Sequence, residues 1–413
     1  MITDIAARAK KASRALVGLP EGAKAQALRA AAQGLREKRA DLERENARDV
    51  AGARERGLST AMIDRLTLTE GVIESMARAL EEIADLPDPV GRITGMTRRP
   101  NGLVVGKMKI PIGVVAIIYE SRPNVTADAA GLCLKAGNAV ILRGGSEAIH
   151  SNSAIAEVLK GALARSGIEP DVIGFIPVTD RQAISELLSL EEYIDLVIPR
   201  GGEGLIRTVV ENSRIPVLKH YKGVCHIFVD RDADFGKAYS ICINAKVQRP
   251  GVCNAMETLL VDEAVARDFL PGMIGLFREH GVEIRGCEKT RAIVDGVLPA
   301  TEDDWYTEFL DLVLAVKVTA GMQEAIDHIE QYGSDHTEAI ITENYTRAME
   351  FLRMVDSSTV LVNASTRFAD GGEFGLGAEV GISTSKIHSY GPMGIEDLTI
   401  GKFIVFGDGQ IRT

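Results

Sequence analysis

The sequence predicts an α/β protein built on parallel sheets, and three observations lead to that class. Between residues 113 and 229, short apolar strands alternate with helical segments, as they do in a parallel sheet with helices on both faces. A second series of this kind runs from residue 257 to about residue 363. The chain has 413 residues, which is enough for two or three domains.

Residues 1–86 are rich in Ala, Arg, Glu and Leu at helical spacing, so they predict helices packed over a sheet. Thr69 followed by Glu70 marks the start of one of these helices, and Pro87 and Pro89 follow its end. We assign this region a structural role.

Residues 98–110 predict a polar β-hairpin. Asn101 and Gly102 form the dipeptide most typical of a tight hairpin turn. The segment 103–110 then alternates apolar residues with small or basic ones, as a strand with one wet face does. Such a hairpin has no core of its own, so we expect it to pack on another subunit. Its basic residues fit a solvated or interface face better than a ligand site.

The first α/β series is expected to form a sheet whose ligands bind beyond the carboxyl ends of its strands. Its predicted strands are 114–119, 139–143, 173–178, 195–199 and 227–229, with a short apolar piece at 217–218, and its predicted helices are 125–135, 146–165, 181–189 and 203–212.

The second series ends in a glycine-rich tail. Its predicted strands are 257–261, 313–318, 338–341 and 358–362, and its predicted helices are 263–280, 321–331 and 344–354. Residues 375–381 have the spacing Gly-x-Gly-x-x-x-Gly with no strand leading in, so we interpret them as a close-packed turn and not as a phosphate loop. A last strand is expected at 398–406.

The composition excludes several classes of partner. The chain has 47 basic and 58 acidic residues, a net charge of −11, which does not attract nucleic acid or an anionic membrane. No apolar run approaches the roughly 18 residues of a membrane span, and the first residues lack a signal-peptide core. A small anionic substrate stays compatible with this charge, because local arginines can form a positive pocket.

The cysteines predict free thiols in a reducing cytoplasm, and neither a disulfide framework nor a zinc site. There are five, an odd number, with no Cys-x-x-Cys pair: Cys133, Cys225, Cys242, Cys253 and Cys287. The seven histidines show no metal-ligand spacing, so no metal is expected.

Cys253 is the candidate nucleophile. A lone cysteine before an apolar strand usually belongs to the core, but Arg249 and Asn254 make this segment more polar than a core segment. A nearby cation favours the thiolate, which is the form that attacks carbonyl carbon. His336, in the polar segment 332–338, is a candidate for substrate contact, and the alternative is a role in stabilising its turn.

Two loops could hold a dinucleotide phosphate at a helix amino end. In the first, 141–147, Gly144 and Gly145 allow close backbone approach, Ser146 can cap the helix and Arg143 offers positive charge. The second is 197–205, again a strand, glycines and a helix. Neither has the Gly-x-Gly-x-x-Gly fingerprint, and the alternative is that both are ordinary connectors.

Long motifs resemble the γ-glutamyl phosphate reductase family, which lies within the aldehyde dehydrogenase superfamily. They cover nearly the whole chain and comprise residues 119–126, 137–147, 198–204, 249–254, 328–336, 362–368, 374–381 and 386–394. No amino-acid kinase segment precedes them, so we expect the stand-alone enzyme.

The resemblance implies reduction of L-glutamyl 5-phosphate by NADPH to glutamate 5-semialdehyde, with phosphate release, as a step of proline biosynthesis in the cytoplasm. It implies a Rossmann-like cofactor domain (1–96 and 112–246), an α/β catalytic domain (247–384) and a small β oligomerisation element (97–111 and 385–413). The expected partners are the small-molecule substrate and further copies of the chain, as a dimer or tetramer. An association with glutamate 5-kinase is a further expectation.

The resemblance also implies roles for particular residues. Cys253 carries a thioester. NADP lies near the residues Arg143, Gly144, Gly145, Ser146, Glu147, Gly201, Gly202, Gly204 and Glu308, the last as a ribose ligand. Substrate and oxyanion contacts fall on Ser121, Arg122, Asn124, Arg249, Asn254, His336 and Arg367. Either Ser121 or Asn124 fills the place of the oxyanion amide. For the three arginines, which can each pair two anionic oxygens, the alternative is an internal salt bridge.

One departure from the superfamily bears on the chemistry. Ordinary aldehyde dehydrogenases place a glutamate base in a Glu-Leu-Gly-Gly-Lys motif, and the corresponding stretch here is Lys219-His-Tyr-Lys-Gly223. A missing base fits a thioester that exchanges with phosphate and not with water. The alternatives are an aldehyde dehydrogenase that uses water on another semialdehyde, and a non-catalytic scaffold that retains the fold.

Overall fold

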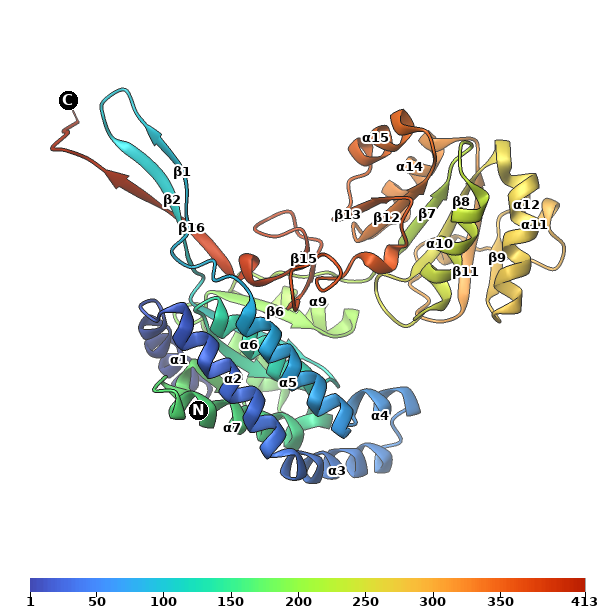
Figure 1. Ribbon diagram of the computed structural model, residues 1–413. Helices are drawn as coiled ribbons and strands as arrows, with labels where there is room; N and C mark the ends of the chain where they lie inside the picture. The colour runs from blue at the N-terminus through green and yellow to red at the C-terminus, as the bar shows by residue number, and fades with distance from the viewer. Residues whose placement is uncertain (413) are drawn as a thin grey trace. The chain divides into compact units, whose positions relative to one another are not determined.

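The computed structural model describes residues 1–412, apart from the side chains of Ala61 and Arg181, and divides into two compact units. The first unit comprises residues 1–219, 375–381 and 393–413, and the second comprises residues 220–374 and 382–392. Each unit contains a parallel sheet flanked by helices, so the predicted α/β class is confirmed (Figure 1). The division falls between Lys219 and His220, whereas the sequence predicts a boundary at residue 246.

The first unit is built on a four-stranded parallel sheet in the order β5-β4-β3-β6. The strands are β3 (Val114–Tyr119), β4 (Ala139–Arg143), β5 (Ile173–Phe175) and β6 (Leu196–Arg200). The chain runs from β3 outward to β5 and returns to place β6 on the other side of β3. This order is that of one half of a Rossmann fold, and its switch point lies between β3 and β6.

Helices cover both faces of this sheet because successive strand residues point to opposite sides. Val115 and Ile117 pack with buried residues of α2, α5, α6 and α7, while Val114 and Ala116 pack with those of α1, α8 and α9. The helices are α1 (Ile2–Leu16), α2 (Glu21–Glu37), α3 (Arg39–Glu55), α4 (Thr60–Leu66), α5 (Glu70–Asp85), α6 (Asn124–Lys135), α7 (Ile149–Arg165), α8 (Arg181–Leu188) and α9 (Glu203–Asn212). The predicted helix start at Thr69 is confirmed, since its side chain accepts a hydrogen bond from Val72 N–H.

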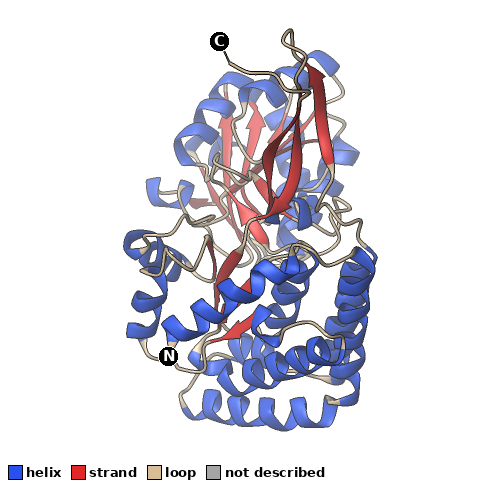
Figure 2. Cartoon of the chain, turned by 90° about the vertical axis from the view of Figure 1, so that its left-hand side faces the viewer, coloured by secondary structure: helices blue, strands red, loops and turns tan. Residues whose placement is uncertain are grey.

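A three-stranded antiparallel sheet projects from the helices of the first unit (Figures 1 and 2). Its strands are β1 (Ile93–Arg98), β2 (Val104–Pro111) and β16 (Thr399–Phe406). The hairpin predicted around Asn101 and Gly102 is confirmed, and so is its combination with the carboxyl-terminal strand. β16 pairs with β2 along its whole length, from Thr399 opposite Pro111 to Phe406 opposite Val104.

The second unit is built on a seven-stranded sheet in the order β10-β9-β11-β8-β7-β12-β13, and every pairing in it is parallel. The strands are β7 (Cys225–Val229), β8 (Met256–Asp262), β9 (Glu283–Gly286), β10 (Leu298–Pro299), β11 (Val313–Thr319), β12 (Thr337–Ile341) and β13 (Thr359–Val362). β7, β8 and β12 are buried throughout, although each contains polar residues, among them His226, Glu257 and Glu338.

The helices of the second unit pack on both faces of its sheet. They are α10 (Phe235–Val247), α11 (Glu263–Glu279), α12 (Glu288–Ile293), α13 (Glu302–Trp305), α14 (Met322–Tyr332) and α15 (Tyr345–Met354). The short strands β14 (Gly381–Ser383) and β15 (Gly391–Met393) pair with each other. Among residues 1–412, no helix has the length and apolar character needed to cross a membrane.

The segment after β4 differs from its prediction, and the glycine-rich segment 375–381 agrees with its prediction. The segment predicted to be helical from residue 146 begins as a 3-10 turn, Ser146–Ala148, and Ser146 makes no capping hydrogen bond because α7 starts only at Ile149. The glycine-rich segment 375–381 is a close-packed turn, as expected. Gly377 has a φ of +78°, and a Cβ there would lie 2.7 Å from the Leu86 side chain.

His328, on α14, gives the second unit an acid-sensitive core. It is 2% exposed, it packs on Trp305 and Tyr332, and its Nδ1 lies 3.2 Å from Lys317 Nζ. An ammonium only donates, so Nδ1 accepts and the ring is neutral. Burial lowers the pKa of His328 from 6.5 to about 2.

We expect this burial to make stability fall as the pH drops below 6.5. The unfolded chain gains a proton there and the folded chain does not, so stability that is fully present above pH 6.5 decreases by about 1.4 kcal/mol per pH unit. His328→Gln should therefore lose about 2 kcal/mol less than the wild type between pH 7 and pH 5. Urea unfolding at both pH values measures this difference. The exposed His280→Gln is the control, and an equal slope in wild type and His328→Gln would contradict the prediction.

Candidate active site

The second unit gathers three reactive side chains at one edge of its sheet. His220 precedes β7, Cys253 precedes β8 and His336 precedes β12. These three strands are neighbours in the order β8-β7-β12 and run parallel, so their amino ends meet at the same edge. The site therefore lies at the amino ends of the strands, and not at the carboxyl ends where ligands usually bind in open α/β sheets.

The three side chains lie close enough to act together. Cys253 Sγ and one ring nitrogen of each histidine all lie within 4.8 Å of one another. The two imidazoles meet edge to face, with ring centroids 5.7 Å apart and an interplanar angle of 71°. Among the described residues, this is the one cluster of His, Cys, Asp or Glu with spacing that a metal ion could also use, although the sequence predicts no metal.

The cysteine loop is held by tight backbone packing. A Cβ at Gly223 would lie 1.8 Å from Cys253 carbonyl oxygen, so only glycine fits there. Cys225 Sγ donates to the same oxygen at 3.2 Å, and Val224 N–H donates to Ser334 Oγ at 2.9 Å. The Lys219–Gly223 stretch, which the sequence aligns with the superfamily's base motif, thus ends directly against Cys253.

Cys225 is a structural thiol. It is fully buried, and burial raises its pKa well above the ordinary value, with the nearby Glu338 carboxylate adding to the effect. A thiol in this state neither ionises nor meets a substrate. Cys253 is only half-buried, which agrees with its selection as the candidate nucleophile.

Asn254 and Arg367 connect the segment that carries the nucleophile to residues 367–369. Asn254 is buried, and its Nδ2 donates to the carbonyl oxygen of Ala369 at 3.0 Å and to that of Arg367 at 3.4 Å. Its Nδ2 therefore positions the 367–369 segment, while its buried Oδ1 has no hydrogen-bond partner among the described residues, and the predicted substrate contact of Asn254 stays a prediction. Arg367 Nε donates to Gln248 Oε1 at 3.0 Å, which is a hydrogen bond to a neutral amide and not the predicted alternative of a salt bridge, so its substrate contact stays a prediction.

Two guanidinium groups act electrostatically on this thiol region. Burial lowers the pKa of Arg367, the charge of Arg249 lowers it further and the Cys253 thiolate raises it. Arg249 itself is exposed. An anionic substrate suits this arrangement, because it adds a negative charge beside two cations.

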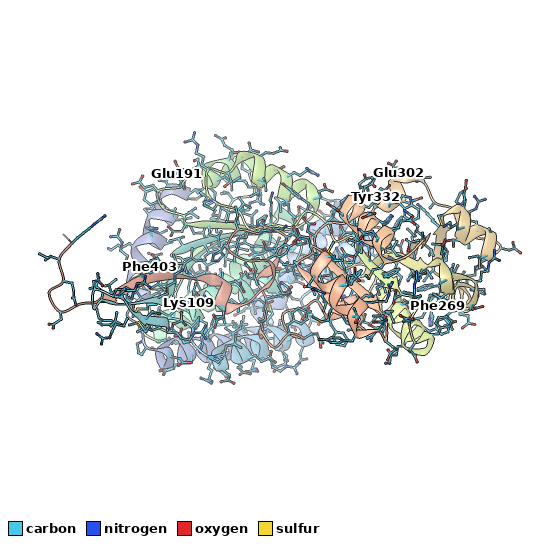
Figure 3. All side chains as sticks on the ribbon, turned by 90° about the horizontal axis from the view of Figure 1, so that it is seen from above. Lys109, Glu191, Phe269, Glu302, Tyr332 and Phe403 are labelled. Atoms are coloured by element: carbon cyan, nitrogen blue, oxygen red, sulfur yellow. The ribbon has the colours of Figure 1, made fainter. Side chains whose placement is uncertain are left out.

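Glu308 lies behind the same loop. Its Oε1 accepts a hydrogen bond from Gly223 N–H at 2.9 Å, and Lys222 Nζ donates to Tyr306 carbonyl oxygen at 2.6 Å. Tyr332 hydroxyl donates to Glu302 Oε1 at 2.6 Å and ties α14 to the start of this segment (Figure 3). Part of the Glu308 carboxylate thus holds the site's own backbone, and its predicted role as a ribose ligand stays a prediction.

Sequence reasoning missed a buried ion pair under the cysteine loop. Lys246 Nζ and Glu257 Oε2 lie 2.6 Å apart, and both side chains are fully buried. Glu257 Oε1 also accepts from Leu310 N–H at 3.1 Å. Burial raises the pKa of Glu257 to about 7 and lowers that of Lys246. The sequence does show that Lys246 and Glu257 flank the candidate nucleophile, eleven residues apart and with opposite charges. This spacing could have indicated the ion pair.

His336 is more buried than a polar turn suggests, its substrate contact stays a prediction, and the place of His220 beside Cys253 was not predicted. The sequence places His336 in a polar turn, but it is fully buried, with Nδ1 2.8 Å from Thr337 Oγ1 and 3.7 Å from Cys225 Sγ. His220 is half-buried, and its Nδ1 lies 2.9 Å from Ile382 carbonyl oxygen. The sequence feature that could have indicated His220 is its position in Lys219–Gly223, the stretch that replaces the superfamily's base motif.

The first unit carries the predicted cofactor loops at the carboxyl edge of its own sheet. Ser121, in the left-handed region at φ +36°, donates from Oγ to Glu147 Oε1 at 2.7 Å. Gly202 N–H donates to Glu120 Oε2 at 2.9 Å across the switch point between β3 and β6. Ser121 and Glu147 therefore meet, and so do the loops that follow β3, β4 and β6.

Two buried hydrogen-bond donors near the loop after β4 have no protein partner in the described part of the chain, and this fits a bound dinucleotide. Arg143 donates from Nη2 to Thr179 carbonyl oxygen at 3.1 Å, while its buried Nε has no hydrogen-bond partner among residues 1–412. Asn152 Nδ2, also buried, has none within the described chain either. A Cβ at Gly144 would lie 2.0 Å from that Nδ2, and one at Gly145 would lie 2.1 Å from the Glu147 carboxylate. Both glycines are therefore required by the packing of this chain's own side chains, and the observation that fits a polar ligand is the pair of buried donors that lack partners among the described residues.

The two remaining predicted substrate residues of the first unit, Arg122 and Asn124, lie just before α6 and at its first position, while Gly201 and Gly204 follow β6. Asn124 Nδ2 donates to Asp128 Oδ2 at 3.1 Å. One N–H of the amide that is a candidate for the oxyanion contact is therefore already used. Arg122 is exposed. The predicted set thus divides between the units: Cys253, Arg249, Asn254, Glu308, His336 and Arg367 lie in the second, and the other predicted residues lie in the first.

Comparison with known proteins identifies the class. The model of the aldehyde dehydrogenase family matches residues 1–284. Together with the two α/β units and a cysteine at the edge of the second sheet, this match shows that the chain belongs to the aldehyde dehydrogenase family.

Individual relatives give the branch of the family. The chain is 62% identical to a γ-glutamyl phosphate reductase of Desulfatibacillum aliphaticivorans, over 100% of this chain and 99% of that protein. It is 58% identical to that of Desulfotalea psychrophila over the same shares. A crystal structure of γ-glutamyl phosphate reductase from Thermotoga maritima covers 100% of both chains at 48% identity, with a TM-score of 0.98. Within its family the chain therefore belongs with the γ-glutamyl phosphate reductases, oxidoreductases of proline biosynthesis.

Proposed function

We propose that the chain reduces L-glutamyl 5-phosphate with NADPH to glutamate 5-semialdehyde and phosphate, through a thioester on Cys253. The observation that carries the proposal is a half-buried thiol beside Arg249 and Arg367 at the edge of the second sheet. A phosphate-bearing acyl group suits this pair of cations, and a thiolate suits its carbonyl carbon. The names of the relatives point to the same substrate class.

The chemistry assigned to this chain's residues begins at Cys253. Its thiolate forms a bond to the acyl carbon, and the bond from that carbon to the phosphate oxygen breaks, so phosphate leaves with the bonding electrons. Backbone N–H groups of the cysteine loop stabilise the oxyanion. The contribution of Ser121 or Asn124 stays a prediction. The bound nicotinamide would supply a hydride to the thioester carbon, after which the carbon–sulfur bond breaks and the thiolate is restored.

The cofactor is proposed to lie on the first unit at the loops after β3, β4 and β6. Aldehyde dehydrogenases use NAD or NADP, and NADPH is the finer proposal. Arg143 Nε and Asn152 Nδ2 are the donors that would meet it, with Glu147 and the glycines 144, 145, 201 and 202 along its path. Glu308 would hold a ribose. Association with glutamate 5-kinase, which would supply the acyl phosphate, stays a prediction.

The reverse reaction tests the proposed function. The enzyme is supplied with glutamate 5-semialdehyde and NADP⁺, with and without phosphate, and the reduced cofactor is followed by absorbance. We expect continuous turnover only with phosphate, because phosphate must accept the acyl group from Cys253. Continuous reduction without phosphate would mean that water reaches the thioester, and the enzyme would then be an ordinary aldehyde dehydrogenase.

The projecting sheet is proposed as the contact between subunits. Members of the aldehyde dehydrogenase family are commonly oligomeric. The sheet exposes large apolar side chains on its outer strands, including Phe403, Val405 and Phe406 at 70%, 55% and 59% exposure (Figure 3). Apolar residues gathered on a sheet edge mark an interaction surface. A dimer or tetramer formed through this sheet would cover them.

We expect Phe403→Asp to lower the mass of the particle in solution. A carboxylate in place of this ring would lose its hydration if the sheet forms the interface, which costs several kcal/mol. Lys107, which lies opposite on β2 with its Nζ 5.1 Å from the ring centroid, would offset only part of that cost. Size-exclusion chromatography with light scattering gives the mass. Tyr345→Asp is the matched control, since Tyr345 is 78% exposed on α15 of the other unit. An oligomer unaffected by Phe403→Asp and by Phe406→Asp would place the interface elsewhere.

A further inference from the structure

The proposed reaction needs a group that takes the thiol proton of Cys253, and the residues so far assigned supply none. Lys219 stands where the superfamily has its glutamate, and a lysine ammonium donates protons at neutral pH. The two imidazoles beside Cys253 are the candidates, because each has a ring nitrogen within 4.8 Å of Sγ. Nucleophile and base pairs are often this loose before substrate binds.

The hydrogen bond of His220 fixes which of its nitrogens is basic. Its Nδ1 lies 2.9 Å from Ile382 carbonyl oxygen, and a carbonyl oxygen only accepts. In the neutral ring the proton is therefore on Nδ1, and Nε2 carries the lone pair. This is the arrangement of a cysteine–histidine pair whose imidazole is oriented by a third group.

His336 is less suited to the same task. It is fully buried, and its Nδ1 faces Thr337 Oγ1 at 2.8 Å and the buried Cys225 thiol at 3.7 Å. An imidazolium there would lose its hydration without a compensating exposed surface. Its ring instead stands edge to face against His220 and limits the movement of that ring. His336 is thus a positioning residue.

The charges around the Cys253–His220 pair are mixed. Arg367 interacts electrostatically with both Arg249 and Cys253. The stretch that carries His220 also holds Lys219 and Lys222, and Glu308 accepts a hydrogen bond from its Gly223 N–H. The assignment of the base therefore rests on the distance between His220 and Cys253 and on the hydrogen bond of His220 to Ile382.

We propose that His220 is a catalytic residue: it takes the Cys253 thiol proton on Nε2, with Ile382 carbonyl oxygen and His336 holding its ring. The inference deepens the proposed function and rests on it for the role of Cys253. The thiol S–H bond breaks, its electron pair stays on sulfur and the proton moves to Nε2. The imidazolium then gives this proton to the leaving phosphate. The thiol is restored by one proton from water, which is the proton that the reduction of an acyl phosphate by NADPH consumes.

The test is the rate at which iodoacetamide alkylates Cys253 in the full-length enzyme, measured across pH 5–10 and located by peptide mass mapping. His220→Asn is the informative variant, because its Nδ2 can keep the hydrogen bond to Ile382 while no basic nitrogen remains. We expect its alkylation at pH 7 to be at least about tenfold slower, with the rate recovering as the pH rises toward the range of an ordinary thiol. Turnover at pH 7 should fall by about 10²-fold or more, and it should also recover as the pH rises.

Controls separate this role from structural and metal-binding alternatives. His280→Asn, at the exposed C-cap position that follows α11, should leave both measurements unchanged, and His220→Asn should keep the melting temperature of the wild type. An alkylation profile that His220→Asn does not change would overturn the proposal. So would a bound equivalent of zinc in the purified protein whose removal by EDTA speeds alkylation, because the cluster would then be a metal site. Phosphate-independent turnover with an altered profile would reject the proposed substrate and leave the role of His220 standing.

Discussion

Cys253→Ser is expected to lower turnover by about 10⁴-fold or more while the dissociation constant for NADPH stays within about twofold. Removal of a catalytic nucleophile costs rates of this order in hydrolases that work through acyl-enzymes. Serine is a far weaker nucleophile at neutral pH, because its hydroxyl does not ionise there. The proposed cofactor loops belong to the other compact unit, so nucleotide binding should persist. Steady-state kinetics and fluorescence titration measure the two quantities.

Cys225→Ser is the matched control for this substitution. Cys225 lies beside the same loop and donates to Cys253 carbonyl oxygen, but it is fully buried and burial raises its pKa. A serine hydroxyl can donate to the same oxygen, so turnover should remain within about threefold of the wild type. A loss at Cys225 as large as the loss at Cys253, with the fold intact, would show that the wrong thiol had been chosen.

Gly223→Ala is expected to have the second largest effect, through the backbone of the nucleophile. The added methyl carbon would lie 1.8 Å from Cys253 carbonyl oxygen and 2.8 Å from its Cα. No rotamer change can relieve a contact between two backbones, so the cysteine loop must move. A displacement of about 1 Å at a reacting group costs about 10²-fold in rate, and overpacking costs about 1–3 kcal/mol in stability. Turnover and urea unfolding report both.

Gly275→Ala in α11 is the control for the glycine substitution. A Cβ at Gly275 meets nothing within 4 Å, so alanine should leave turnover unchanged and raise stability by up to about 1 kcal/mol. If Gly223→Ala keeps wild-type turnover, Cys253 is not held by the Lys219–Gly223 stretch in the way described.

The fold was predictable because its elements carry local signals. The predicted strands between Val114 and Val362 are short, mostly apolar segments bounded by turns, and the predicted helices between them keep the helical period. The short strands β9 and β10 and the helices α12 and α13 were not predicted, because these elements are brief and β9, Glu283–Gly286, is largely polar. Asn101 and Gly102 specify the hairpin through the positive φ that such a turn requires, which is +89° at Gly102. Cys253 could be selected because its polar neighbours are adjacent in the sequence.

The composition of the site was less predictable because strand order is not a local property. His220 and His336 lie 33 residues before and 83 residues after Cys253, and only the order β8-β7-β12 brings them together. The same long-range packing turns the expected polar turn at His336 into a buried strand start. It also makes Asn254 a support for the 367–369 segment, through a contact with Ala369 that no local pattern indicates.

The most direct test of Cys253 as the covalent nucleophile is the mass of the enzyme after incubation with glutamate 5-semialdehyde and NADP⁺ in the absence of phosphate. We expect one glutamyl acyl group per chain, mapped to the peptide that contains residues 249–254, and its loss when phosphate is added. An unmodified Cys253 in an enzyme that still shows phosphate-dependent turnover would contradict the thioester mechanism.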